Sequence, residues 1–127
     1  MSQAHSANAS IVTLEAGGVI NPGHAVVISA GKVVECTAAD TFFGVYVGTE
    51  ACASGDFVSI CVAGVCKVFA DGTSAISIGS LLGNDASGHF AVNATDKDLI
   101  AGRALEALAS GTAFIEAIVG PAIFNAV

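Results

Sequence analysis

The stretch Ala53-Ser54-Gly55-Asp56-Phe57 returns later in the chain as Ala109-Ser110-Gly111-Thr112-Ala113-Phe114, and the glycines of the two stretches stand 56 residues apart. The same spacing separates two further pairs of glycines, Gly23 from Gly79 and Gly64 from Gly120. Around these anchors, residues 19–69 and 76–124 repeat one order of glycines, apolar runs and turn signals. A solenoid needs about three or more stacked copies. The sequence therefore predicts two related halves closed on each other within one domain.

Short runs in which apolar and polar residues alternate predict β-strands in both copies. The expected strands of the first part of the chain are residues 10–15, 25–28, 32–36, 42–47, 56–62 and 65–69, with a turn at Gly64 between the last two. Those of the second part are residues 81–84, 89–93, 99–108 and 112–119, followed by a tail at 121–127. Fifteen glycines and this spacing of short strands favour an all-β fold, a small barrel or sandwich built from two halves.

Residues 98–108 are the exception, because they are rich in helix-forming residues. Their counterpart in the first copy, residues 41–49, is aromatic and β-branched, which favours a strand. Because corresponding segments of the two copies should adopt the same structure, we predict that both are strands.

Residues 1–9 are small and polar and show no periodicity, so we expect a flexible N-terminal arm followed by a single β domain over residues 10–127. The chain starts without the basic residues and apolar run of a secretion signal. Synthesis in a host cytoplasm is therefore expected.

The formal net charge of −7 argues against nucleic acid and anionic membranes as partners. The four basic residues are scattered along the chain: Lys32, Lys67, Lys97 and Arg103. With 54% hydrophobic and only 12% charged residues, a free monomer would have difficulty covering its surface with polar groups. Self-association, or a place in a larger assembly, is favoured.

The four cysteines, Cys36, Cys52, Cys61 and Cys66, lie in apolar runs of strand-like sequence. A chain of this size without a secretion signal does not need disulfide staples. Zinc knuckles require closer spacing or nearby histidines. Buried free thiols are the favoured reading, with a disulfide or a metal site as the alternatives.

Residues able to carry out chemistry form no recognisable motif. His5 lies in the arm, His24 after a turn and His89 at the start of a strand, and no serine or cysteine stands at a catalytic spacing from them. The segment 79–83 lacks the lysine of a phosphate-binding loop. Asp71-Gly72 reads as ordinary turn chemistry. We therefore predict no catalytic residue, no cofactor and no metal.

The arrangement Gly-Gly-Val-x-x-Pro-Gly-x-x-Val-Val at residues 17–27 is followed by Phe43-Gly44-Val45 and Ser54-Gly55-Asp56. A second round contains Gly102-Arg103-Ala104-Leu105-Glu106-Ala107 and Ile115-Glu116-Ala117. Over residues 10–120 this pattern resembles the capsid decoration, or cement, proteins of tailed bacteriophages. Thr112 departs from it, since an acidic residue is usual there. The resemblance implies a β-rich structural protein, often trimeric, on the outside of an icosahedral head with the major capsid protein as partner.

Both chain ends are predicted to contact a partner. The arm is too polar to pack in the protein's own core, and the tail is too apolar to hang free in water. The expected contact residues are Ser2, Gln3, His5, Asn8, Ile123, Phe124 and Val127. In the alternative reading the tail closes the protein's own barrel. Alternative functions are another virion subunit (tail, fibre or spike base) and a ligand-binding or enzymatic barrel.

Overall fold

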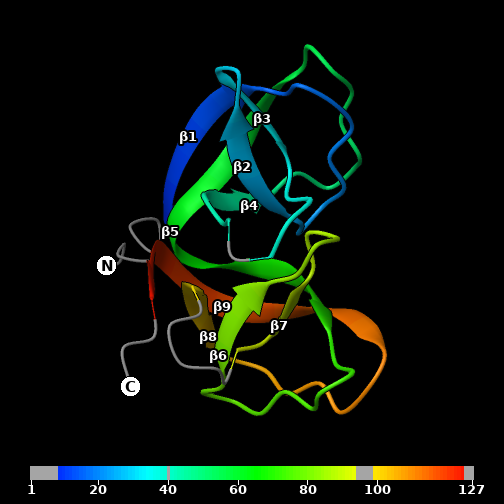
Figure 1. Ribbon diagram of the computed structural model, residues 1–127, viewed down its shortest axis with the longest axis vertical. Helices are drawn as coiled ribbons and strands as arrows, with labels where there is room; N and C mark the ends of the chain where they lie inside the picture. The colour runs from blue at the N-terminus through cyan, green and yellow to red at the C-terminus, as the bar shows by residue number, and fades with distance from the viewer. Residues whose placement is uncertain (1–8, 40, 94–98, 125–127) are drawn as a thin grey trace, which may run out of the picture.

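The computed structural model describes residues 9–39, 41–93 and 99–124, and these residues form an all-β fold (Figure 1). The predicted fold class is confirmed, and in the described part of the chain no helix is long and apolar enough to cross a membrane. The strands are β1 (Ala9–Glu15), β2 (Ala25–Ser29), β3 (Lys32–Glu35), β4 (Gly44–Tyr46), β5 (Phe57–Asp71), β6 (Leu81–Asn84), β7 (Phe90–Val92), β8 (Leu99–Ala104) and β9 (Thr112–Phe124).

The second half of the chain forms a closed barrel. Its strands pair in the ring β5–β7–β6–β8–β9, and β9 returns to β5 over eight residue pairs from Gly64–Val119 to Asp71–Thr112. Every pairing in the ring is antiparallel except the seam between β5 and β7, where Ala70 and Phe90 form a single parallel pair. A barrel of this kind has no free sheet edge within its ring.

The first half repeats this plan. β1 pairs with β5, β5 with β4, β4 with β2 and β2 with β3. The ring is completed by an isolated parallel bridge between Ala16 and Val33, which joins the corresponding strands as the Ala70–Phe90 pair does in the second half, although Ala70 lies two residues and Phe90 one residue away from the position that the 56-residue shift would give. Isolated bridges outside the strands follow the same repeat, from Ile20–Cys52 to Ile76–Leu108, a shift of 56 residues in both partners. The spacing read in the sequence is thus also the spacing of the strand pairings.

One expectation was wrong, because Gly64 does not make a turn between two strands. β5 is continuous over 15 residues, and it passes from the upper half of the molecule into the lower half (Figure 1). Gly64 has a φ of 116°, and beside it the register of β1 against β5 shifts between Ser10 and Ile11. A bulge and a glycine with positive φ bend a strand without ending it. β5 therefore serves both barrels.

The predicted strand 99–108 is present but shorter, because β8 ends at Ala104. The tail differs more, since residues 121–124 continue β9. In the backbone, Ile123 pairs with Ile100 and Phe124 with Leu99, both in β8 of the same chain.

Two clusters of buried side chains fill the halves, one in each. The cluster of the second half also takes in residues of the first half, so the two halves pack directly against each other. The first cluster comprises Ala16, Ile20, Val26, Val33, Tyr46, Cys52, Val58 and Ile60; the residues of the first half that join the second cluster are Ala25, Cys36, Phe42, Val45 and Cys61.

Hydrogen bonds also join the halves. The Phe69 amide donates to the Gly23 carbonyl at 2.9 Å, and the Ala25 amide donates to the Gly88 carbonyl at 2.8 Å. The buried side chain of Asn84 accepts from the Thr41 amide at 3.2 Å and donates to the Ala38 carbonyl at 3.0 Å. Because buried polar groups hold their partners in fixed geometry, we regard the two halves as one rigid body.

Candidate functional site

The predicted contact residues fall into two groups. Ser2, Gln3, His5, Asn8 and Val127 lie outside the described residues. Ile123 and Phe124 lie in β9, where only their backbone pairing with β8 is described. Whether any of these residues contacts a partner stays a prediction.

Gly64, at the bend of β5, links the two chain ends in space. On one side it pairs with Ala9, the first residue of β1, and on the other with Val119 of β9. The strand that follows the arm and the strand that runs into the tail therefore flank the same point of β5. This point is the waist of the molecule, where the upper half meets the lower (Figure 1).

An apolar groove of about 290 Å³ lies at this waist. Among the described residues that line it, Lys67 is the one that carries a charge. Ala9 also lies on its wall, so the described chain begins at the groove itself. Large apolar depressions on a protein surface are typical of binding sites. We call this the waist groove, lined by Ala9, Ile11, Pro22, Gly23, Tyr46, Val47, Gly48, Val65, Cys66, Lys67 and Phe114.

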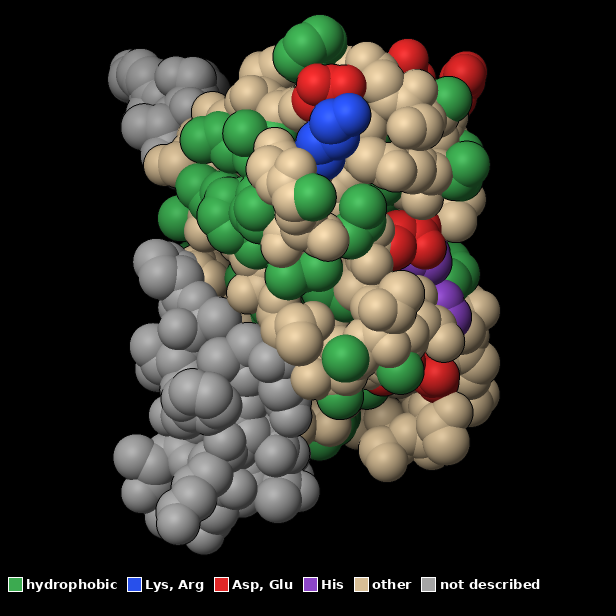
Figure 2. All heavy atoms as spheres, turned by 45° about the horizontal axis from the view of Figure 1, so that its top comes forward, with side chains coloured by type: hydrophobic (Ala, Val, Ile, Leu, Met, Phe, Trp, Pro, Cys, Tyr) green, Lys and Arg blue, Asp and Glu red, His purple; other side chains and the backbone are tan. Residues whose placement is uncertain are grey.

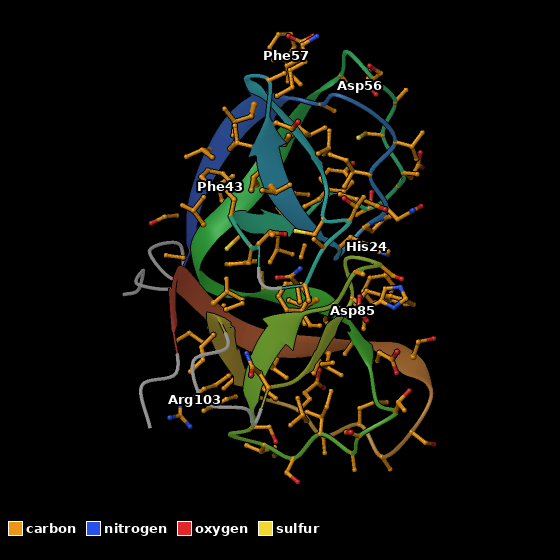
Figure 3. The ribbon with its side chains drawn as sticks, in the orientation of Figure 1. His24, Phe43, Asp56, Phe57, Asp85 and Arg103 are labelled. Atoms are coloured by element: carbon orange, nitrogen blue, oxygen red, sulfur yellow. The ribbon has the colours of Figure 1, made fainter. Side chains whose placement is uncertain are left out.

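β1 offers a second surface beside the groove. One edge of β1 pairs with β5. Within the described part of the chain, the other edge is joined to β3 by the bridge at Ala16, directly after β1. Ile11 and Val12 on this strand are 46% and 37% exposed. Figure 2 shows hydrophobic side chains gathered on this side of the upper half, and Figure 3 places Phe43 there as well. An edge strand with apolar side chains is a template for an added strand.

Large apolar side chains also stand free at the loops. Phe57 is 74% exposed and projects at the top end of the molecule beside Asp56 (Figure 3). Ile78 is 71% exposed in the loop before β6, where the neighbouring Gly79 carbonyl accepts from Arg103 at 3.0 Å. Exposed apolar side chains that stand singly are common on folded proteins, so these two residues do not by themselves mark a binding surface.

Titratable groups converge on the other side of the waist, where His24 meets the loop before β7. His24 is buried, it stacks on Phe69 with ring centres 5.5 Å apart, and its Nδ1 lies 3.3 Å from Glu35 Oε2. His89 packs edge-on against both rings, at 5.0 Å from His24 and 5.1 Å from Phe69. Burial lowers the pKa of His24, and Glu35 opposes that effect. Figure 2 shows histidine and acidic side chains side by side in this region.

The family model for phage cement proteins matches residues 4–119. The chain belongs to the phage cement protein family. No curated protein matches it.

Among solved structures, this chain is similar to the N base of head fibre gp8.5 in bacteriophage phi29. The TM-score is 0.59 at 16% sequence identity, over 88% of this chain and 94% of that chain. At this identity the likeness concerns the fold. Family membership makes this chain a structural component of the phage virion, carried on the head.

Sequence reasoning did not find two surface features of the described strands, the exposed Phe57 side chain and the waist groove. Phe57 was open to inference, because Val58 and Ile60 point into the core and alternation turns Phe57 outward. The waist groove could not be inferred from the sequence, since residues from β1, β5 and β9 meet there only once the strands pair.

The four cysteines are free thiols, with Cys36, Cys52 and Cys61 buried and Cys66 half-buried.

Proposed function

We propose that this protein binds the outer surface of a phage head and cements neighbouring capsomers, with the major capsid protein as its partner. The match to the phage cement family over residues 4–119 is the observation that carries this proposal. The rigid double barrel with exposed apolar side chains supports it, because a clamp needs a stiff body and adhesive faces rather than a reaction centre.

The arm and the tail supply the contacts at the waist. The described chain begins with Ala9 on the wall of the waist groove, and the arm with its expected contact residues Ser2, Gln3, His5 and Asn8 precedes Ala9 in the sequence. The arm adds a strand to the capsid protein or to a neighbouring subunit through its backbone. The tail residues Ile123, Phe124 and Val127 belong to the same contact region, since β9 leaves Gly64 on the opposite side.

The net charge supports the outer surface rather than the interior. A chain of net charge −7 inside a head would face the phosphates of the packaged genome and be repelled by them. On the outside the same charge keeps the exposed faces hydrated. Nucleic acid and membrane are therefore not partners in this proposal.

The proposal includes a homotrimer. Three linked copies gain strongly in avidity, because the second and third contacts form at high effective concentration. The exposed edge of β1 and the waist groove offer apolar area for self-association. Sedimentation equilibrium measures the assembly, and a mass near three times the chain mass of 12.5 kDa is expected.

Truncation of the arm tests the proposed attachment. Removing residues 1–8 leaves all of β1 in place, so the melting temperature should stay within about 1 °C of the full chain while binding to heads weakens at least tenfold. Val19→Ser is the matched control, because it removes an exposed apolar group that lies outside both β1 and the waist groove. Equal binding of the truncated and full chains would show that the arm takes no part.

The alternative is a tail, fibre or spike-base subunit of the same virion. Copy number separates the two, because a cement protein is present in proportion to the capsomers and a spike base in far fewer copies. Quantitative mass spectrometry of purified virions, with the major capsid protein as the internal reference, decides between them.

A further inference from the structure

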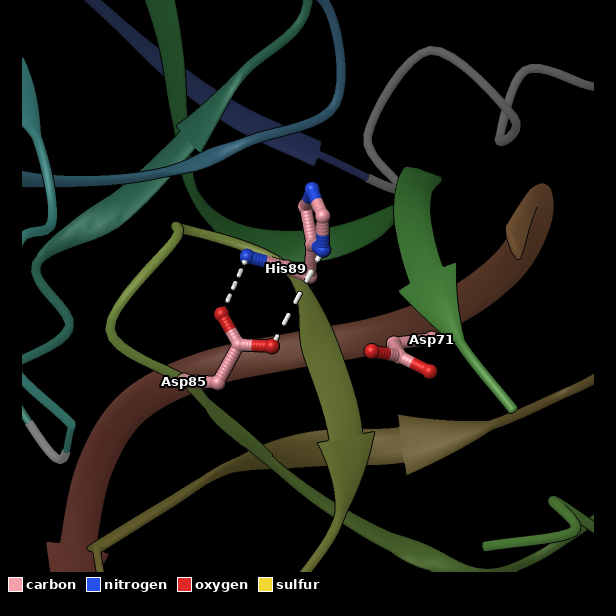
Figure 4. A group of neighbouring side chains, drawn as sticks. All are labelled: Asp71, Asp85 and His89. Carbon is pink, nitrogen blue, oxygen red and sulfur yellow. Dashed lines mark hydrogen bonds and ion pairs between the residues drawn. The ribbon is translucent and has the colours of Figure 1, made fainter. Parts of the chain in front are cut away.

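Three potential metal ligands converge at the seam that closes the second barrel. Asp71 is the last residue of β5, Asp85 follows β6 and His89 precedes β7 (Figure 4). Ligand atoms of the three side chains lie within 4.8 Å of one another. The seam is the weakest pairing of the ring, with Ala70 and Phe90 as its one residue pair. Asp71 and His89 are the immediate neighbours of that pair.

In the first barrel, the positions that correspond to Asp71 and His89 carry a simple ion pair. Its seam is the Ala16–Val33 bridge, and beside it Lys32 Nζ lies 3.2 Å from Glu15 Oε2. By the repeat, Asp71 stands where Glu15 stands, a shift of 56 residues, and Gly88-His89-Phe90 takes the place of Gly31-Lys32-Val33. At the seam of the second half, a histidine therefore stands where the first half has a lysine.

The exchange leaves negative charge without a permanent counter-charge. In the described part of the chain, no lysine or arginine forms an ion pair with Asp71 or Asp85. His89 Nδ1 lies 3.9 Å from Asp85 Oδ2, and an imidazole carries a charge only when it is protonated. Two carboxylates that lie this close together repel each other. A cation between them removes that repulsion.

The carboxylates are held in position to accept a cation. Asp71 Oδ1 accepts from the Thr73 hydroxyl at 2.7 Å and from its amide at 2.9 Å. These two bonds hold the carboxylate of Asp71 in one orientation. Asp85 Oδ1 accepts from the amides of Ser87 and His89 at 2.8 and 3.0 Å. In each case Oδ1 is fixed by the local turn, which orients Oδ2 as outer-shell partners orient a metal ligand.

We propose that Asp71, Asp85 and His89 bind one divalent transition-metal ion, Zn²⁺ or Mn²⁺, which ties β5 to β7 as the Lys32–Glu15 pair ties β3 to β1. One imidazole with two carboxylates suits these ions better than Ca²⁺, which prefers oxygen ligands alone. Tetrahedral coordination with bonds of about 2.1 Å brings ligand atoms to roughly 3.5 Å from one another. Side-chain rotations that move the ligand atoms by about 1 Å close that gap, and water completes the shell.

Metal titration of the full chain tests the proposal. Protein treated with EDTA and dialysed is titrated with ZnCl₂ and with MnCl₂ in a calorimeter, and melting curves are recorded with and without metal. We expect one ion per chain, a melting temperature at least about 5 °C higher at saturating metal, and weaker binding of Ca²⁺. The variants Asp71→Asn and His89→Gln should each bind at least tenfold more weakly.

Two controls separate this site from other ligands in the chain. Glu15→Gln breaks the equivalent ion pair in the first half and should leave the response to metal intact. Cys66→Ser should also keep it, which excludes thiol binding at the half-buried cysteine.

His89→Lys rebuilds the ion pair of the first half at the second seam. Without metal this variant should melt above metal-free wild type, and it should no longer respond to Zn²⁺. Wild type that binds neither ion, or Asp71→Asn and His89→Gln variants that bind as tightly as wild type, would overturn the proposal.

Discussion

Gly23 shows at a single residue how the two halves are held together. Its φ is 77°, its amide donates to the Tyr46 carbonyl at 2.9 Å, and its carbonyl accepts from Phe69. A Cβ at this position would lie 2.8 Å from the Phe69 amide nitrogen and 2.9 Å from a ring carbon of Phe114. The ring can rotate, but the backbone nitrogen cannot move without breaking the contact between the halves.

Gly23→Ala should therefore lower the free energy of unfolding by about 2–4 kcal/mol, from a left-handed backbone and a steric clash together. Gly31→Ala is the matched control, because Gly31 has a φ of 80° and open space around its Cβ position. It should cost only about 1 kcal/mol. Chemical denaturation measures both variants, and equal losses would mean that the contact at Gly23 is unimportant.

The thiols are protected by burial. Burial raises the pKa of the Cys36 thiol, and burial followed by the neighbouring Cys61 raises that of Cys66. A raised pKa favours the neutral thiol in the folded state, so these groups stabilise the fold at neutral pH and this contribution is lost as the pH rises above 9, where the unfolded thiols ionise.

Native protein at pH 8 should react with a bulky aromatic disulfide reagent at least tenfold more slowly than protein unfolded in guanidinium, because the thiolate is the nucleophile. A reducing agent should leave the melting temperature unchanged. Rapid release of all four thiols from native protein, or a fall of several degrees on reduction, would contradict this view of the cysteines.

The end of β9 distinguishes the two hypotheses for the tail, which either contacts a partner or closes the protein's own barrel. The backbone pairs Ile123–Ile100 and Phe124–Leu99 hold it to β8. Removing residues 125–127 deletes none of the described pairings and should leave the melting temperature unchanged. Removing residues 121–127 should lower the free energy of unfolding by about 1–3 kcal/mol, from two lost strand pairs.

Thermal melting and head binding of both truncations distinguish the two readings. If the longer truncation melts like the full chain and loses only head binding, the tail is a contact segment and the pairing with β8 adds no stability.

The strands were predictable because their signals are local. Alternating apolar residues and glycines predicted the strands Ala25–Ser29 and Leu81–Asn84 and the start of β9 at Thr112 to within a few residues. The repeat correctly predicted a strand, β8, in a segment that is rich in helix-forming residues. The continuity of β5 was not predictable, since a glycine in a strand run reads as a turn unless the partner register is known. The parallel seams were hidden for a similar reason. They join strands that are not neighbours in the chain, and Asp71, Asp85 and His89 meet only when the second ring closes.

For the whole molecule, repetition within one chain joins two small barrels through a shared strand. Five short strands alone bury little apolar surface, so one half would be marginal in water. β5 gives both rings a common wall, and the packing of Phe42 and Val45 into the core of the second half makes them one body. A stiff body of this kind can transmit load between the capsomers to which it is attached, as the proposed function requires.

The most direct test of the central proposal is the binding of purified full-length protein to genome-filled phage heads that lack it. Cosedimentation through a sucrose cushion, quantified against the major capsid protein, should show saturable binding in a fixed ratio to the capsomers. Saturated heads should retain their DNA on heating better than bare heads do. Protein that stays in the supernatant, or that binds only to isolated tails, would contradict the account.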